Sequence, residues 1–114
     1  MHKTAYIYLA QQVGSNLYKI GSSYDPDSRI KQLQTANGEK IQLIETFETS
    51  YKFKLEKSLH RKFIQHQTLG EWFALREEDV LNFIKICKIQ EDYFNLLIEN
   101  NTYIQDRELK NKKW

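Results

Sequence analysis

Residues 4–21 constrain the fold most strongly, because two β-rich segments are separated there by a short run of turn-forming residues. Segments 4–9 and 17–21 are rich in β-branched and aromatic residues, which favour strands. The intervening residues 13–16, Val-Gly-Ser-Asn, are typical of a turn. A β-hairpin with a loop of a few residues is therefore predicted, and the rest of the chain must pack against it.

A helix and a third strand are expected after the hairpin. Asp25 can cap the N-terminus of the helix, and Pro26 suits its first position. Ile30 and Leu33 form its buried side, and the Asn-Gly pair at 37–38 ends it. Residues 41–47 then read as a strand.

The second half of the chain is mainly helical by its apolar spacing. Residues 51–65 carry Leu55, Leu59 and Phe63 one turn apart, residues 70–75 are short and strand-like, and acidic residues 77–79 open another helix. A further helix is expected over 91–108, with an interruption near Asn100 and Asn101.

The predicted order is β-β-α-β-α, followed by a short strand and C-terminal helices. This order favours an α+β fold, a small three-stranded antiparallel sheet flanked by helices. The predicted domain covers residues 1–89, and residues 90–114 form a C-terminal helical extension with a frayed polar tail.

Length and cysteine content narrow the class of protein. A chain of 114 residues supports one domain, and no apolar run approaches the roughly 18 residues of a membrane span. The single cysteine, Cys87, cannot form an internal disulfide, and three scattered histidines make no zinc pattern. We therefore expect an intracellular protein, in a reducing compartment.

The positive charge is concentrated in the first part of the chain. Residues 1–66 hold ten Lys and Arg against six Asp and Glu, whereas residues 67–114 hold seven against nine. A basic N-terminal part is typical of proteins that present one face to a polyanion, although many other proteins share it.

Five motifs follow one another along residues 4–80. They are Tyr6-Ile7-Tyr8, Tyr18-Lys19-Ile20-Gly21, Arg29 on the first helix, Leu55-Glu56-Lys57-Ser58-Leu59-His60-Arg61-Lys62-Phe63, and Gly70-Glu71-Trp72-Phe73. In this order and spacing they resemble the GIY-YIG nuclease superfamily, in the branch found widely in phages and large DNA viruses. The resemblance implies a metal-dependent DNA endonuclease that hydrolyses phosphodiester bonds.

The resemblance also implies roles for the hairpin residues. Tyr8 would lie at the attacking water, and Tyr18 is a further candidate catalytic residue of the second motif. Lys19 stands where the family usually has its second tyrosine, so the general base stays open between Tyr8 and Lys19.

The helices are expected to supply the phosphate and metal contacts. By the resemblance, Arg29 would bind the scissile phosphate, and Glu56 would hold Mg²⁺ or Mn²⁺ through oxygen. His60 lies one turn after Glu56 and would assist proton transfer or contact the phosphate, and Glu71 is the second candidate metal ligand. The family's late asparagine has no clear counterpart, Asn82 being the nearest choice.

A DNA-binding surface is predicted from clustered cations, of which the candidates are Lys31, Lys52, Lys57 and Arg61. They could equally form a solvated helix face. Two other functions stay open: a nucleic-acid-binding module without catalysis, and an interaction protein that docks through residues 90–114. A monomer or a homodimer would fit the DNA endonuclease.

Overall fold

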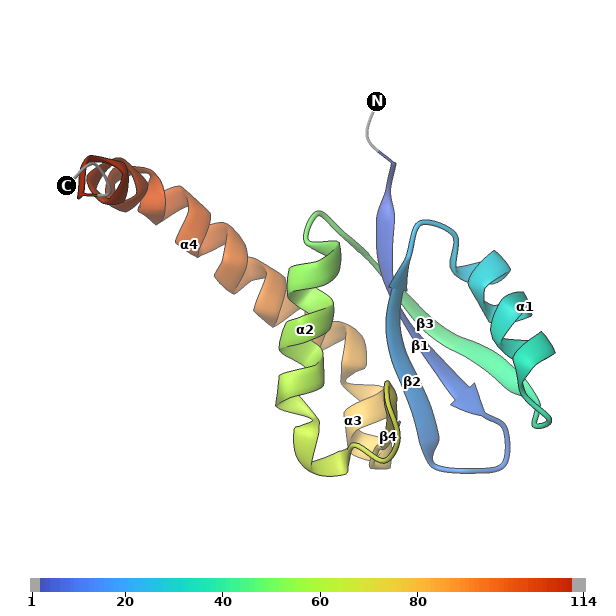
Figure 1. Ribbon diagram of the computed structural model, residues 1–114. Coiled ribbons are helices and arrows are strands. Elements are labelled where there is room, and N and C mark those ends of the chain that lie inside the picture. The colour runs from blue at the N-terminus through green and yellow to red at the C-terminus, as the bar shows by residue number, and fades with distance from the viewer. Residues whose placement is uncertain (1–2, 112–114) are drawn as a thin grey trace.

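The protein is built on a four-stranded antiparallel sheet with helices on both faces (Figure 1). The structure, a computed structural model, describes the backbone of residues 3–111 and the side chains of residues 3–99. Its elements are β1 (Ala5–Gln12), β2 (Leu17–Ser23), α1 (Pro26–Ala36), β3 (Ile41–Thr49), α2 (Lys52–Lys62), η1 (Ile64–His66), β4 (Trp72–Ala74), α3 (Glu77–Leu81) and α4 (Phe83–Asn111). The predicted fold class, α+β with an antiparallel sheet flanked by helices, is confirmed.

The strands follow the order β3-β1-β2-β4. The predicted hairpin forms β1 and β2. The sheet has four strands instead of the predicted three, because the short strand after the second helix, β4, pairs with β2. On β2, the partners of β4 are Leu17, Tyr18 and Lys19. In the described part of the chain, the later residues of β2 therefore lie at an edge that no strand covers.

Two apolar clusters form on opposite faces of the sheet, because successive strand residues point to opposite sides. On one face, Ile7, Leu9 and Ile20 pack with the buried residues of α2 and α4. On the other face, Tyr8 and Ala10 pack with Leu33 of α1 and Ile41 of β3. Figure 1 shows this division, with α1 on one side of the sheet and α2 and α4 on the other.

The start of α1 is the one that the sequence predicts. The Asp25 carboxylate accepts hydrogen bonds from the backbone N–H and the hydroxyl of Ser28, and Pro26 begins the helix. These hydrogen bonds lower the pKa of Asp25. The cap fixes where α1 begins, and hence where Arg29 lies relative to the sheet.

The predicted interruption near Asn100 and Asn101 is wrong, because α4 runs without a break from Phe83 to Asn111. Asparagine lowers helix propensity by only about 0.7 kcal/mol relative to alanine, and this stretch holds no glycine or proline. The helix instead breaks earlier, at Asn82, which separates α3 from α4. The tail prediction for residues 112–114 lies outside the described residues.

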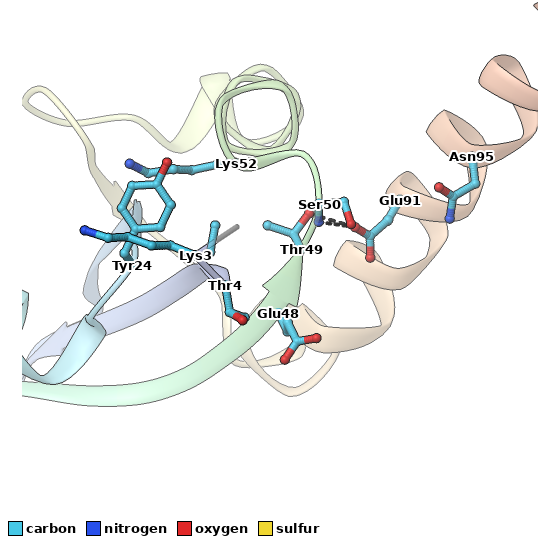
Figure 2. A pocket seen from close by; sticks show the side chains of 10 residues that line it. Lys3, Thr4, Tyr24, Glu48, Thr49, Ser50, Lys52, Glu91 and Asn95 are labelled. Atoms are coloured by element: carbon cyan, nitrogen blue, oxygen red, sulfur yellow. Dashed lines mark hydrogen bonds between the residues drawn. The ribbon is translucent and has the colours of Figure 1, made fainter. Parts of the chain in front are cut away.

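The first turns of α4 are fastened to the sheet and to α2. The Glu91 carboxylate accepts hydrogen bonds from the Thr49 hydroxyl (2.7 Å) and the Ser50 backbone N–H (3.2 Å), as Figure 2 shows. Phe94 is buried, and Asn95 accepts a hydrogen bond from the Tyr51 hydroxyl. Glu91, Phe94 and Asn95 thus contact the packed body. No helix in the described residues is long and apolar enough to cross a membrane.

The glycine at position 21 is needed for the packing of Tyr8. A Cβ at Gly21 would lie 2.5 Å from the Tyr8 hydroxyl oxygen and 2.6 Å from its ring carbon Cζ. Tyr8 is fully buried, so its ring has no room to move away. We expect Gly21→Ala to lower the free energy of unfolding by about 1–3 kcal/mol, as overpacked sites do, measured by urea denaturation.

Gly38→Ala is the matched control, because a Cβ at Gly38 meets nothing within 4 Å. Equal stability of the two variants would show that Tyr8 does not occupy the space above Gly21.

Candidate functional site

The candidate site lies at the edge of β2 that β4 leaves uncovered. Lys19 reaches it from the α1 face of the sheet, where the Tyr8 ring covers Gly21. Glu56 and His60 approach from α2 on the opposite face, one helical turn apart. Glu71 lies in the turn before β4, between the two groups. Both faces of the sheet therefore contribute polar groups to one short stretch of edge.

A nearly buried ion pair joins the two sides of the site. The Lys19 Nζ lies 3.0 Å from a Glu71 carboxylate oxygen, and the Lys19 side chain is only 9% exposed. The Trp72 ring lies beneath the ammonium, 5.7 Å from Nζ to the ring centroid. Because a buried charge is tolerated only with a partner, this pair fixes the position of Glu71. Lys19 is thus a buried residue of the strand, held at the site by its carboxylate partner.

Three potential metal ligands meet at this edge. Ligand atoms of Glu56, His60 and Glu71 all lie within 4.8 Å of one another. Glu56 is held by a hydrogen bond from the Ser22 hydroxyl. His60 Nε2 lies 2.7 Å from the Ile20 carbonyl oxygen. A carbonyl can only accept, so Nε2 carries the proton and Nδ1 of the neutral ring keeps its lone pair.

The two carboxylates differ in acidity. Burial and the negative charge of Glu71 raise the pKa of Glu56, against the opposing effect of the Ser22 hydrogen bond. Burial also acts to raise the pKa of Glu71, but the hydrogen bond and charge of Lys19 outweigh it, and the net pKa is lowered. Two close carboxylates thus share one ammonium group. The excess negative charge favours either a proton on Glu56 or a bound cation.

Tyr8 and Arg29 border this acidic group. Burial raises the pKa of the Tyr8 hydroxyl, while the nearby Arg29 guanidinium opposes the rise, and the charges of Glu71 and Glu56 add to it. Arg29 is half-buried, and its Nη1 donates a hydrogen bond to Gln32 (3.1 Å). Among the described side chains, no carboxylate lies within 4.0 Å of the guanidinium. Arg29 therefore does not form the pair with Asp25 that its spacing allows.

The structure brings together Tyr8, Lys19, Arg29, Glu56, His60 and Glu71, but it places Tyr18 elsewhere. Tyr18 packs against the apolar cluster on the α2 face. Side chains alternate along a strand, so its neighbour Lys19 must point to the opposite face. Tyr18 is therefore not one of the six residues that meet at this edge, and its catalytic role stays a prediction.

Asn82 and Ser22 have roles that differ from those expected from the sequence. Asn82 donates a hydrogen bond to the Glu78 carbonyl at the end of α3, which is a structural contact at a helix end. Ser22, which orients Glu56, was not among the predicted site residues. Its signal is the alternation of β2, because Ile20 and Ser22 share the face that α2 covers.

Of the predicted DNA-binding cations, three are exposed and one is half-buried. Lys31 lies on α1, and Lys57 and Arg61 lie on α2, all open to solvent. Lys52 is half-buried and sits over the Tyr24 ring, with Nζ 4.2 Å from the ring centroid.

A family model described as the T5orf172 domain matches residues 4–88, which include all six residues that meet at the site. Searches of the curated proteins and of the solved structures gave no significant match.

The raised pKa of Glu56 predicts a pH-dependent effect of Glu56→Gln. A raised pKa means that the folded state holds the proton more tightly than the unfolded state, so the wild type loses stability as pH rises above the ordinary value of 4.5. Below that pH the two proteins should differ little. Above it, in EDTA, Glu56→Gln should become progressively more stable than the wild type, measured by urea denaturation from pH 4 to 8.

Glu45→Gln, at an exposed position of β3, should follow the wild type over the same range. If instead the wild type became more stable than Glu56→Gln as pH rises, the buried Glu56 charge would not be destabilising, and the prediction would be wrong.

Divalent cations should stabilise the folded protein by binding at the group of Glu56, His60 and Glu71. A cation that binds only the folded state adds about 2.7 kcal/mol at a concentration one hundred times its Kd. Mn²⁺ or Mg²⁺ should therefore raise the melting temperature of the wild type and of Glu45→Gln, but much less that of Glu56→Gln. Calorimetry at pH 7.5 measures this. An equal rise in all three proteins would place the cation elsewhere.

Proposed function

The chain belongs to the T5orf172 domain family, and we propose that it is a metal-dependent DNA endonuclease of the GIY-YIG type. The observation that carries the proposal is the meeting of Glu56, His60 and Glu71 beside the Tyr8 and Arg29 side chains. Phosphodiester hydrolysis needs a positioned water, a proton acceptor and positive charge at the phosphate. The link of this domain family to nucleases agrees with that chemistry.

Glu56 and Glu71 are the residues that would hold the divalent ion. Their oxygens suit Mg²⁺ or Mn²⁺, and their mutual repulsion is relieved by a cation. Ser22 and Lys19 keep the two carboxylates in place from opposite faces of the sheet. When bound, the ion supplies positive charge that polarises the phosphate and makes a water more acidic.

Arg29 binds the phosphate in this proposal. Its guanidinium is planar and always charged, and it can donate two parallel hydrogen bonds to phosphate oxygens. Its guanidinium donates a hydrogen bond to the neutral amide of Gln32, which an incoming phosphate can replace, and it lies beside the Tyr8 hydroxyl. The positive charge beside Tyr8 therefore remains available to substrate.

His60 takes the proton from the attacking water, and Tyr8 orients that water. Tyr8 keeps its proton at neutral pH because burial raises its pKa, so it acts as a hydrogen-bond donor. Lys19 is engaged with Glu71, which leaves it a positioning role. Nδ1 of His60 is the remaining lone pair, since Nε2 is bound to the Ile20 carbonyl. In this proposal the general base is therefore His60 and neither Tyr8 nor Lys19.

Cleavage assays test this function directly. Linear, branched and flapped DNA, each with Mg²⁺ or Mn²⁺, should be cut by the wild type and not in EDTA. Arg29→Ala and Glu56→Gln should each lower the cleavage rate by at least about 10²-fold, because each removes charge stabilisation from the transition state. Lys85→Ala removes an exposed cation from α4 and should cleave like the wild type.

Undiminished cleavage by Arg29→Ala would refute the assigned phosphate contact. A pure protein that binds DNA in a salt-sensitive manner but never cleaves would favour a non-catalytic binding module.

A further inference from the structure

Beside the candidate site lies a second group of residues, in which two exposed aromatic rings flank a lysine. Lys52 Nζ lies 4.2 Å from the Tyr24 ring centroid and 4.9 Å from that of Phe53. Lys3 Nζ lies 5.7 Å from the Tyr24 centroid. Phe53 is 74% exposed and Tyr24 is 49% exposed. We call Tyr24, Lys52 and Phe53 the aromatic platform.

The residues of the aromatic platform lie near residues of the candidate site, both after β2 and on α2. Tyr24 follows Ser22 by two residues, and Ser22 holds Glu56. Lys52 precedes Glu56 by four residues on α2, which is about one turn, or about 6 Å along the helix axis. A nucleic-acid strand rises about 3.4 Å per nucleotide, so the platform is one or two nucleotides from a phosphate at Glu56.

The charges around the platform favour a strand that enters from one direction. Figure 2 shows the hollow beside Tyr24, with Lys3 and Lys52 at its Tyr24 end and Glu48 and Glu91 on the side of β3 and α4. The acidic side repels a phosphate backbone, and the two lysines attract it. The nucleic-acid backbone is thereby kept next to Lys52 and the Tyr24 ring.

Exposed rings beside cations suit an unpaired nucleotide. An aromatic side chain can stack on a base only when the face of that base is free, and such stacking tolerates any base sequence. A lysine between the rings neutralises the adjoining phosphate. A blunt duplex offers the phosphate without the free base, so it would use the lysine alone.

Building on the proposed nuclease function, we propose that the aromatic platform binds an unpaired nucleotide next to the scissile phosphate. The preferred substrate is then DNA with a single-stranded segment at the cleavage point, such as a flap, rather than a blunt duplex. Phe53 and Tyr24 provide the stacking surfaces. Lys52 and Lys3 contact the phosphate backbone of the DNA.

Fluorescence anisotropy in EDTA, with the full chain, tests this proposal without cleavage. The probes are a blunt duplex, the same duplex with a single-stranded flap, and a single-stranded oligonucleotide as DNA or as RNA. The wild type should bind the flapped duplex and single-stranded DNA more tightly than the blunt duplex. Phe53→Leu should weaken binding of the flapped DNA about tenfold and leave blunt duplex binding unchanged.

Matched variants separate stacking from bulk and charge. Phe53→Tyr keeps a ring and should bind like the wild type, and Leu81→Ala removes an equally exposed apolar residue from α3. Lys52→Gln should reduce the salt dependence of binding by about one phosphate contact. Equal affinity for all DNA forms, or unchanged flap binding in Phe53→Leu, would overturn the proposal. Tighter binding of the RNA than of the DNA oligonucleotide would overturn its DNA assignment.

The two proposals fail in different ways. Suppose that cleavage requires Glu56 and Arg29 and that Phe53→Leu changes neither cleavage nor flap binding. The endonuclease proposal would then hold, and the proposed role of the aromatic platform would be wrong. Flap binding that needs Phe53, in a protein that cleaves no DNA, would do the reverse.

Discussion

The contact of the Tyr8 ring with the Gly21 backbone is the constraint on which the site depends. Tyr8 pairs directly with Gly21 across the hairpin, and only a residue without Cβ leaves space for the ring there. The same register points Lys19 to the Tyr8 face and Ser22 to the α2 face. Because β4 is only three residues long, both sets of side chains meet at an open edge. A longer β4 would have covered that edge with backbone hydrogen bonds.

The charges at this edge are out of balance in a way that folding alone does not explain. The one ammonium of Lys19 faces Glu71, and Glu56 stands beside them with a raised pKa. A group of this kind lowers the stability of the folded chain at neutral pH, as sites that await a ligand often do. The acidic excess on the α2 side and the Arg29 guanidinium on the α1 side are complementary to a cation and a phosphate, respectively.

Local sequence signals predicted much of this arrangement. They could not predict which residues far apart in the sequence contact one another. The hairpin, the Asp25 cap and the shared face of Glu56 and His60 follow from neighbours within a few residues. The Lys19–Glu71 pair spans 52 positions and needs the pairing of β2 with β4 to be known. Tyr18 was assigned to the site by its motif, and strand alternation places it on the α2 face, packed against the apolar cluster there. The Asn100–Asn101 break failed because two weak helix formers do not end a helix that lacks glycine and proline.

The exposed ring of Phe53 contributes little to folding, and this supports a role in binding. It lies two positions before Leu55 on α2, so it faces away from the core that Leu55 and Leu59 form. Burying a phenylalanine is worth about 1.5–3 kcal/mol, and the described fold leaves this gain unused. A polar residue would serve a solvated helix face better. The ring sits beside Lys52, one turn from Glu56, where a base next to the reacting phosphate would reach it. The same helix thus positions Glu56, a proposed metal ligand, and, one turn earlier, the proposed stacking surface.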